Sequence, residues 1–270
     1  MKILELMTRQ TLVACLAILF SLNSALAQPT KVYEPMSGQP GKDVMWVPTP
    51  QALVDKMLDV AKVTRDDVVI DLGSGDGRTV ITAAKRGATA LGIEYDANLV
   101  ELSKRHAAKE GVSDKATFVK ADIFESDFSQ ATVITMFLLE DLNRKLRPKL
   151  LGLKPGTRIV SNTFDMGDWK PDEVAYADQV CDTHFYCKAN FWIIPANVAG
   201  TWKLPQGELV LEQKYQMVSG TLKNGNSSVT ISNGRMTGDR ISFSAGGTDY
   251  SGKVTGNVIE GPLQATRVSH

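Results

Sequence analysis

The residues whose types and spacing best suit chemistry lie in the stretch VVIDLGSGDGR, residues 68–78. An apolar run ends in Asp71, and Gly73, Gly75 and Gly77 then alternate with polar residues before a helical pattern begins. A glycine-rich turn between a strand and a helix exposes backbone amides at the positive end of the helix, because no Cβ shields them. Such a turn predicts a site for a nucleoside-containing ligand, either a dinucleotide or S-adenosylmethionine.

The register of the glycines and the charge of the turn favour S-adenosylmethionine as the cofactor. Dinucleotide sites prefer G-x-G-x-x-G, whose third glycine permits close helix packing, but Arg78 stands at that position here. Asp71 and Asp76 are unfavourable neighbours for a pyrophosphate and favourable ones for an ammonium or a sulfonium. A nicotinamide-dependent oxidoreductase is therefore the least favoured function.

Two further acids follow the next two predicted strands. Glu94 ends the second strand, where a carboxylate can accept hydrogen bonds from both ribose hydroxyls. Asp122, in the stretch KADIF, could accept from the adenine amino group while Ile123 covers the ring. Either acid alone could be a solvated residue at a strand end, but acids at successive strand ends together predict an adenosyl site.

The elements that position these residues alternate between short β-branched runs and amphipathic helices. This alternation predicts an α/β fold, a parallel sheet with helices on both faces, and a ligand outside the carboxyl ends of the first strands. The predicted strands span residues 68–72, 89–94, 116–120, 132–139 and 158–163. The predicted helices span residues 50–61, with Thr49 as the cap, then 78–87, 97–111 and 142–153.

The chain changes character after this region. Residues 197–270 contain short alternating segments separated by Asn-Gly and Gly-Gly turn signals, which predict a small antiparallel sheet or half-barrel as a second domain. A cofactor-binding domain is predicted over residues 45–196. Residues 28–44 are polar and rich in Pro and Gly, and predict an extended lead-in.

Composition restricts the classes of partner. The chain of 270 residues has 30 basic and 30 acidic side chains and is 43% hydrophobic, as is ordinary for a globular protein. Because there is no net charge, nothing indicates a surface that attracts polyanions or anionic membranes. Nucleic acid is therefore not predicted as a partner.

The amino terminus predicts export. Lys2 and Arg9 precede a nearly continuous apolar run over residues 11–22, and Ala25-Leu26-Ala27 forms a small-residue cleavage site. Residues 1–27 are thus predicted to be a signal peptide and the mature chain to be periplasmic. The alternative is an uncleaved segment anchored in the inner membrane, which is the only predicted membrane association.

Two cysteines follow the predicted signal, Cys181 and Cys187. Residues 182–184 between them can form a turn, so the sequence leaves open whether the two thiols form a disulfide in an oxidising compartment. His184 adds a third donor, but the spacing is not that of a zinc site, and no metal is predicted.

Several motifs, in this order, resemble the class I S-adenosylmethionine-dependent methyltransferases: WVPTP, VVIDLGSGDGR, GIEYD, KADIF and the stretch 135–169. Over roughly residues 45–195 they resemble bacterial relatives of the mitochondrial ATP-synthase c-subunit lysine N-methyltransferase. The resemblance implies a seven-stranded Rossmann-like sheet and N-methylation of a protein lysine. It places the following residues at the cofactor: Pro48, Thr49, Asp71, Gly73, Ser74, Gly75, Gly77, Glu94, Asp122 and Ile123.

The same resemblance places Phe137, Leu138 and Leu139 beside the transferable methyl group. Relatives often have proline after the paired leucines, whereas this chain has Glu140. Glu140 is therefore a candidate catalytic group that could orient an amine. Asp141 is expected to cap the helix that follows.

An acceptor lysine must lose its proton before it can attack, and an apolar channel would lower its pKa. Phe137 and Trp169 are candidates for lining that channel, although either could be plain core. Asn162 and Asp165 are candidate substrate-side groups or turn residues. Two alternatives to a protein-lysine methyltransferase stay open: a small-molecule methyltransferase and an exported, non-catalytic protein that binds an adenosyl ligand.

Overall fold

The computed structural model describes residues 33–181 and 185–269, and from Pro35 onward they belong to one compact unit. The predicted signal peptide, residues 1–27, and the candidate metal donor His184 lie outside the described residues. No helix in the described part of the chain combines the length and the hydropathy needed to span a bilayer.

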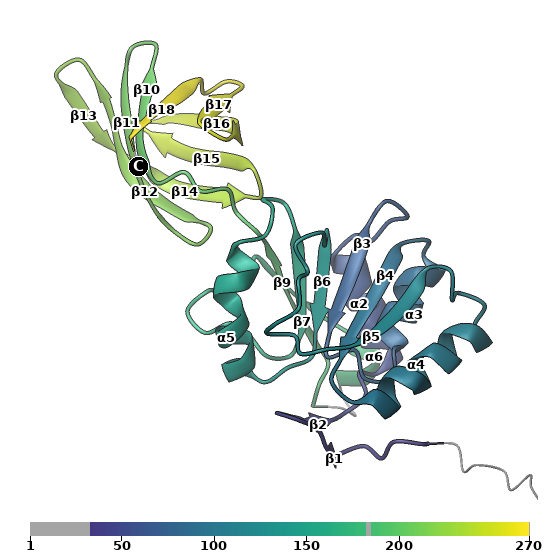
Figure 1. The fold of residues 1–270 in the computed structure, drawn as a ribbon. Coiled ribbons are helices and arrows are strands. Elements are labelled where there is room, and N and C mark those ends of the chain that lie inside the picture. The colour runs from purple at the N-terminus through teal and green to yellow at the C-terminus, as the bar shows by residue number, and fades with distance from the viewer. Residues whose placement is uncertain (1–32, 182–184, 270) are drawn as a thin grey trace, which may run out of the picture. The chain divides into compact units, whose positions relative to one another are not determined.

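Strands between residues 68 and 193 form a seven-stranded sheet with the order β5-β4-β3-β6-β7-β9-β8 (Figure 1). Strands β5, β4, β3, β6 and β7 are parallel, as predicted, and the sequence-adjacent strands β8 and β9 complete the sheet in antiparallel pairing. The strands are β3 Val68–Leu72, β4 Thr89–Glu94, β5 Ala116–Lys120, β6 Val133–Met136, β7 Arg158–Asn162, β8 Glu173–Tyr176 and β9 Lys188–Ile193.

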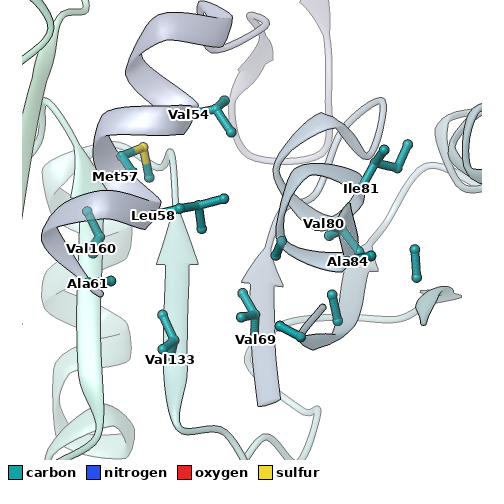
Figure 2. Packing of buried hydrophobic residues seen from close by; sticks show 14 of the residues in the cluster. Val54, Met57, Leu58, Ala61, Val69, Val80, Ile81, Ala84, Val133 and Val160 are labelled. Carbon is teal, nitrogen blue, oxygen red and sulfur yellow. The ribbon is translucent and has the colours of Figure 1, made fainter. Parts of the chain in front are cut away.

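Helices cover both faces of this sheet because successive strand residues point to opposite sides. Val69 of β3 packs in a cluster with α2, α3 and α4, whereas its neighbour Ile70 packs in the cluster of α5. Figure 2 shows Met57 and Leu58 of α2 in the first cluster, close to the sheet residues Val133 and Val160. The helices are α2 Gln51–Val60, α3 Arg78–Lys85, α4 Ala97–Lys109, α5 Glu140–Leu151 and the short α6 Asp178–Cys181.

The predicted cap of α2 is wrong. Pro50 occupies the N-cap position without a side-chain cap. The Thr49 hydroxyl instead accepts a hydrogen bond from Asn162 Nδ2 at 3.1 Å, so the buried Thr49 ties this segment to the end of β7.

The predicted cap of α5 is also wrong, because Leu139 is its N-cap residue and Asp141 lies inside the helix. The lead-in predicted as an extended loop over residues 28–44 contains β1 (Gln39–Pro40), which pairs in a short hairpin with β2 (Met45–Trp46) at the start of the predicted cofactor-binding domain. Each of these strands has two residues, too few for an alternating pattern to appear in the sequence.

The C-terminal strands form the predicted antiparallel sheet, but this sheet closes into a barrel and is not a half-barrel. The ring closes where β18 pairs with β10 and β12 pairs with both β11 and β14, while β13 pairs with β12 outside the ring. Closure leaves no open edge in the ring, and Trp202, Met236 and Phe243 fill its core. Its strands are β10 Gly200–Leu204, β11 Gly207–Lys214, β12 Met217–Asn224, β13 Ser227–Thr230, β14 Ser232–Thr237, β15 Arg240–Ala245, β16 Thr248–Thr255, β17 Val258–Glu260 and β18 Ala265–Ser269.

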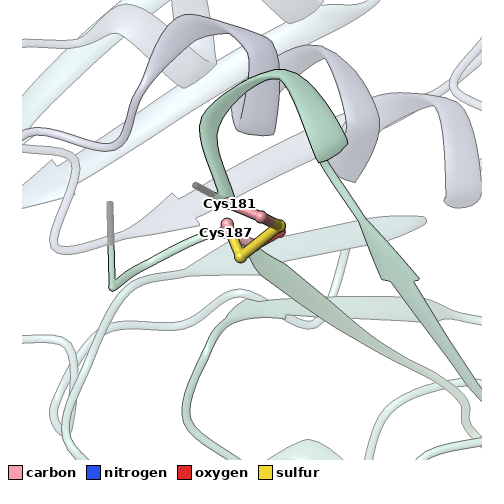
Figure 3. Close-up of a disulfide and its surroundings, with 2 residues drawn as sticks. All are labelled: Cys181 and Cys187. Atoms are coloured by element: carbon pink, nitrogen blue, oxygen red, sulfur yellow. A yellow bond between two sulfur atoms is a disulfide. The ribbon is translucent and has the colours of Figure 1, made fainter. Parts of the chain in front are cut away.

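A disulfide joins Cys181, at the end of α6, to Cys187, just before β9 (Figure 3). Their Cα atoms are 5.1 Å apart, and the Cys187 carbonyl accepts from the Ala177 amide at 2.9 Å. The bridge therefore ties the segment that enters β9 to the segment that leaves β8.

Replacing both cysteines by serine is expected to lower the free energy of unfolding by about 2 kcal/mol, because the short crosslinked loop restricts the unfolded chain. Urea denaturation of the double variant and of the oxidised wild type measures the difference. Equal midpoints would show that the bridge does not contribute to stability.

Candidate active site

A cavity opens at the carboxyl ends of β3, β4 and β6, where the chain has built β3, β4 and β5 and crosses back to add β6 beside β3. Ligands of open α/β sheets bind at this switch point. The cavity wall contains most of the predicted site residues: Pro48, Thr49, Asp71, Gly73, Ser74, Gly75, Glu94, Asp122, Ile123, Phe137 and Leu138. Gly77 and Glu140, also predicted, are not part of the wall.

Asp71, at the end of β3, is the most buried acid of the cavity. Its carboxylate accepts from the Thr135 hydroxyl of β6 at 2.6 Å. Burial raises the pKa of this carboxyl to about 7, the Thr135 hydrogen bond opposes the rise, and the charges of Glu94 and Asp76 add to it. In the part of the chain that the structure describes, no basic side chain forms an ion pair with Asp71.

Glu94, at the end of β4, holds the glycine-rich turn in place. Its two carboxylate oxygens accept from the backbone amides of Gly75 and Asp96, each at 2.9 Å. Burial raises the pKa of Glu94, and these backbone donors oppose that rise. Each oxygen retains a lone pair that a ligand hydroxyl can use.

Asp122, after β5, is already paired with a cation. Lys42 Nζ, from the turn between β1 and β2, lies 2.5 Å from Asp122 Oδ2 and 4.7 Å from the centre of the Tyr95 ring. The hydrogen bond from Lys42 is the main cause that lowers the pKa of Asp122. The β1–β2 hairpin thereby contributes a side chain to the predicted adenine end of the cavity.

Arg78, which stands where a dinucleotide site would have its third glycine, has a structural task. Its guanidinium forms a bidentate ion pair with Asp76 and donates to the Thr49 carbonyl at 2.8 Å. The side chain therefore fastens the glycine-rich turn to the segment that precedes α2.

The glycines of the turn adopt left-handed backbone conformations, with φ of 80° at Gly73, 55° at Gly75 and 82° at Gly77. A Cβ on Gly75 would lie 2.6 Å from the Trp46 indole nitrogen. A Cβ on Gly77 would lie 2.8 Å from both the Phe118 ring and the Ser103 side chain. Gly77 thus allows α3 to pack against β5 and α4 and does not face the cavity.

Gly77→Ala is expected to lower the free energy of unfolding by about 3 kcal/mol, through overpacking and the left-handed backbone together. Gly111→Ala is the matched control, because Gly111 also has a positive φ of 70° but no atom within 4 Å of an added Cβ. Its cost should be about 1 kcal/mol. Equal losses in urea denaturation would refute the packing role of Gly77.

The charged side chains of the cavity are predominantly acidic: Asp43, Asp71, Asp76, Glu94, Asp96 and Asp122. Its basic residues, Lys42 and Arg78, already form ion pairs with three of these acids, Asp43, Asp76 and Asp122. Such a cavity is electrostatically unfavourable for a pyrophosphate and favourable for a cationic nucleoside.

The structure places only some of the residues predicted for the methyl-transfer end of the site in the cavity wall. Phe137 and Leu138 line the cavity, and Glu140 is the exposed first residue of α5. Of the two alternatives for Trp169, an acceptor channel or plain core, the structure bears out plain core. Its indole is fully buried against Trp192 and Tyr215 and donates to Gln216 Oε1 at 2.9 Å.

Asn162 and Asp165 also lie outside the cavity wall. Asn162 is buried and donates to Thr49, and the Asp165 carboxylate accepts from the Gly167 amide at 2.9 Å. Asp165 is thus a turn residue. Among the described residues, no group of His, Cys, Asp and Glu has the arrangement of a metal site.

Comparison with known proteins identifies the family. The ANTKMT methyltransferase domain matches residues 71–173. A protein-lysine N-methyltransferase of Saccharolobus islandicus is 48% identical over 134 residues, which are 48% of this chain and 83% of the relative. The chain belongs to the ANTKMT-type class I S-adenosylmethionine-dependent methyltransferases. The resemblance seen in the sequence motifs is thereby confirmed.

Two further relatives extend the comparison. The human ATP synthase c-subunit lysine N-methyltransferase is 35% identical over 130 residues, and the match spans 48% of this chain and 55% of that enzyme. The crystal structure of an RNA methyltransferase from Salinibacter ruber, in complex with S-adenosyl-L-homocysteine, has 45% identity and a TM-score of 0.52. It covers 56% of this chain and 96% of that one.

The cavity of this methyltransferase fits S-adenosylmethionine. Asp71 and Glu94 have no basic partner among the described residues, and the buried Ser74 hydroxyl has no hydrogen-bond partner there. Buried polar atoms without partners are rare, so the Ser74 hydroxyl in the cavity wall is available for a hydrogen bond to a bound ligand. Individual contacts of these residues with the cofactor stay predictions.

Sequence reasoning missed several residues of the wall, above all Lys42, Tyr95, Phe164 and Tyr186. Tyr95 directly follows Glu94 in the motif GIEYD and could have been found from that position. Lys42 and Tyr186 come from segments that carry none of the motifs, so no local signal pointed to them. Phe164 lies inside the stretch 135–169, but its position there did not indicate that it faces the cavity.

Proposed function

We propose that this methyltransferase transfers the methyl group to the side-chain amine of a protein lysine. The relatives from Saccharolobus islandicus and human carry lysine N-methyltransferase names. The observation that carries the proposal is the acidity of the cavity, continued by the exposed Glu140 and Asp141 next to the wall residue Leu139. These carboxylates attract a cationic lysine segment and repel phosphate.

The chemistry asks little of the protein beyond positioning. S-adenosylmethionine, when bound, supplies a methyl group on a positively charged sulfur: the amine lone pair forms the N–C bond, the C–S electron pair stays on sulfur, and the new ammonium later loses a proton to solvent. Asp71 and Glu94 would hold the donor. Phe137 and Leu138 form apolar wall that excludes water, which favours the neutral, nucleophilic form of a lysine amine.

Radiolabelled S-adenosylmethionine, incubated with lysine-containing peptides, tests the proposal. We expect label on the lysine peptide and none on a peptide of the same sequence with arginine in place of lysine. Labelled RNA would favour the activity that the Salinibacter ruber protein is named for, labelled small metabolites would favour a small-molecule methyltransferase, and no transfer to any acceptor would favour a binding protein.

We also propose that the mature chain is periplasmic, with an anchored form in the inner membrane as the alternative. The Cys181–Cys187 disulfide supports an oxidising compartment. Mass spectrometry of the native amino terminus tests this: a chain that starts at Gln28 agrees with export, whereas an intact amino terminus would favour the anchor. We propose no nucleic acid as a partner of this protein.

A further inference from the structure

Three aromatic side chains from separate segments meet in the wall of the cavity. Phe137 follows β6, Phe164 follows β7, and Tyr186 precedes β9. The ring centre of Tyr186 lies 4.9 Å from that of Phe137 and 6.1 Å from that of Phe164, and the two phenylalanines are 6.2 Å apart. Each side chain is only half-buried, so ring surface remains accessible from the cavity.

The backbone is organised to present Phe164 there. Thr163, a β-branched residue, adopts a left-handed φ of 59°, and the Phe164 amide donates to the Asn162 carbonyl at 2.6 Å. The Phe164 carbonyl accepts from the Ser161 hydroxyl at 2.7 Å and from Asn143 Nδ2 at 3.2 Å, both fully buried donors. Such a conformation is costly and persists where its surroundings impose it, often at functional sites.

Tyr186 is held from its other side. It directly precedes Cys187, whose disulfide to Cys181 fixes the chain just before β9 (Figure 3). Its ring stands at 67° to Phe137 and 47° to Phe164, whereas the two phenylalanines are within 21° of parallel. Because the Tyr186 ring is tilted against the two phenylalanine rings, the three rings form a corner and not a flat stacking surface. Such a corner suits a compact cation better than a flat base.

We propose that Phe137, Phe164 and Tyr186 form the acceptor site, binding the alkylammonium head of lysine and of its methylated products by cation–π attraction. This inference rests on the proposed function for its acceptor. Attack needs the neutral amine, and the positive charge then moves from sulfur to nitrogen as the N–C bond forms. Aromatic faces at the nitrogen end stabilise the arriving charge without offering a base that would be methylated instead.

Leucine substitutions test the site because they keep apolar volume and remove the ring. We expect Phe164→Leu and Tyr186→Leu each to raise the KM for a lysine peptide by about tenfold, with binding of S-adenosylhomocysteine within about twofold of wild type. Tyr186→Phe should rescue the loss. Tyr176→Leu, an exposed residue of β8 outside the cavity wall, is the control.

A binding measurement separates this inference from the proposed function. Nα-acetyl-trimethyllysine amide and its neutral tert-butyl isostere are titrated into the protein saturated with S-adenosylhomocysteine. We expect a preference for the charged probe that Phe164→Leu abolishes, whether or not lysine peptides are methylated. Equal binding of both probes, or an unchanged KM in both leucine variants of an enzyme that methylates lysine, would overturn the aromatic site alone.

Discussion

Replacing Asp71 by asparagine is expected to weaken S-adenosylmethionine binding roughly 100-fold while adenosine binding changes by no more than about twofold. Asp71 lies buried at the end of β3 with a single hydroxyl donor, Thr135, and no basic partner among the described residues. An amide keeps that hydrogen bond but cannot neutralise the cationic part of the cofactor. Calorimetric titration with both ligands measures the contrast.

The same substitution should remove a pH dependence. Because the pKa of Asp71 in the folded protein is about 7, wild-type affinity should increase about tenfold per pH unit up to about pH 7 and then level off. The Asp71→Asn variant should lack this slope. Asp239→Asn changes a partly exposed acid in the turn between β14 and β15 that pairs with Lys253; it is the control and should behave as wild type.

Stability should follow the opposite trend in the absence of ligand. The pKa of an aspartate is about 4 in the unfolded chain, and the pKa of Asp71 in the folded protein is about 7. The contribution of this carboxyl to the free energy of unfolding is therefore complete below about pH 4 and is lost as the pH rises through 7. The loss is at most about 4 kcal/mol. At about pH 8 the Asp71→Asn variant should therefore unfold at a higher urea concentration than wild type; a lower midpoint would contradict the assigned pKa.

Glu94→Ala is expected to weaken adenosine, S-adenosylhomocysteine and S-adenosylmethionine alike, each by roughly 100-fold. The reason is twofold: the carboxylate is the predicted partner of the ribose, and its oxygens hold the amides of Gly75 and Asp96. Loss of Glu94 therefore disturbs the turn as well as the contact. Calorimetry with the three ligands distinguishes this uniform loss from the selective loss in Asp71→Asn.

Two variants control the Glu94 experiment. Glu94→Gln keeps the shape but only one acceptor oxygen, and should give an intermediate affinity. Glu101→Ala removes an exposed acid of α4 that pairs with Lys104, and should bind all three ligands as wild type does. Unchanged adenosine affinity in Glu94→Ala would remove Glu94 from the cofactor site.

Local patterns sufficed for the first three strands of the parallel sheet. β3, β4 and β5 begin and end where the sequence predicted, because each is an apolar run bounded by turn residues. No such pattern predicted β8 or β9 as a strand. β8 is short and mostly exposed, and both strands depend on antiparallel pairing beside β7. Long-range contacts therefore determine the positions of β8 and β9 in the sheet.

In the C-terminal domain, too, local patterns predict the hairpins, whereas long-range contacts decide how they assemble. Asn-Gly and Gly-Gly turns identify its hairpins, since those turn types need the left-handed backbone that glycine and asparagine adopt easily. Closure of the ring requires β18 to return to β10, with Arg267 opposite Trp202. Residues so far apart in sequence leave no short-range signal of their pairing.

The sequence by itself determined the glycine-rich turn, its acids and the family, because turn chemistry and strand periodicity depend on neighbouring residues. The acids Asp71, Glu94 and Asp122 could be brought together in advance, since parallel strands end at one edge of a sheet. Only the tertiary structure decided that Lys42 reaches Asp122 and that Phe137, Phe164 and Tyr186 meet. Those contacts join distant segments, and their geometry follows from how the whole sheet, the hairpin and the disulfide pack.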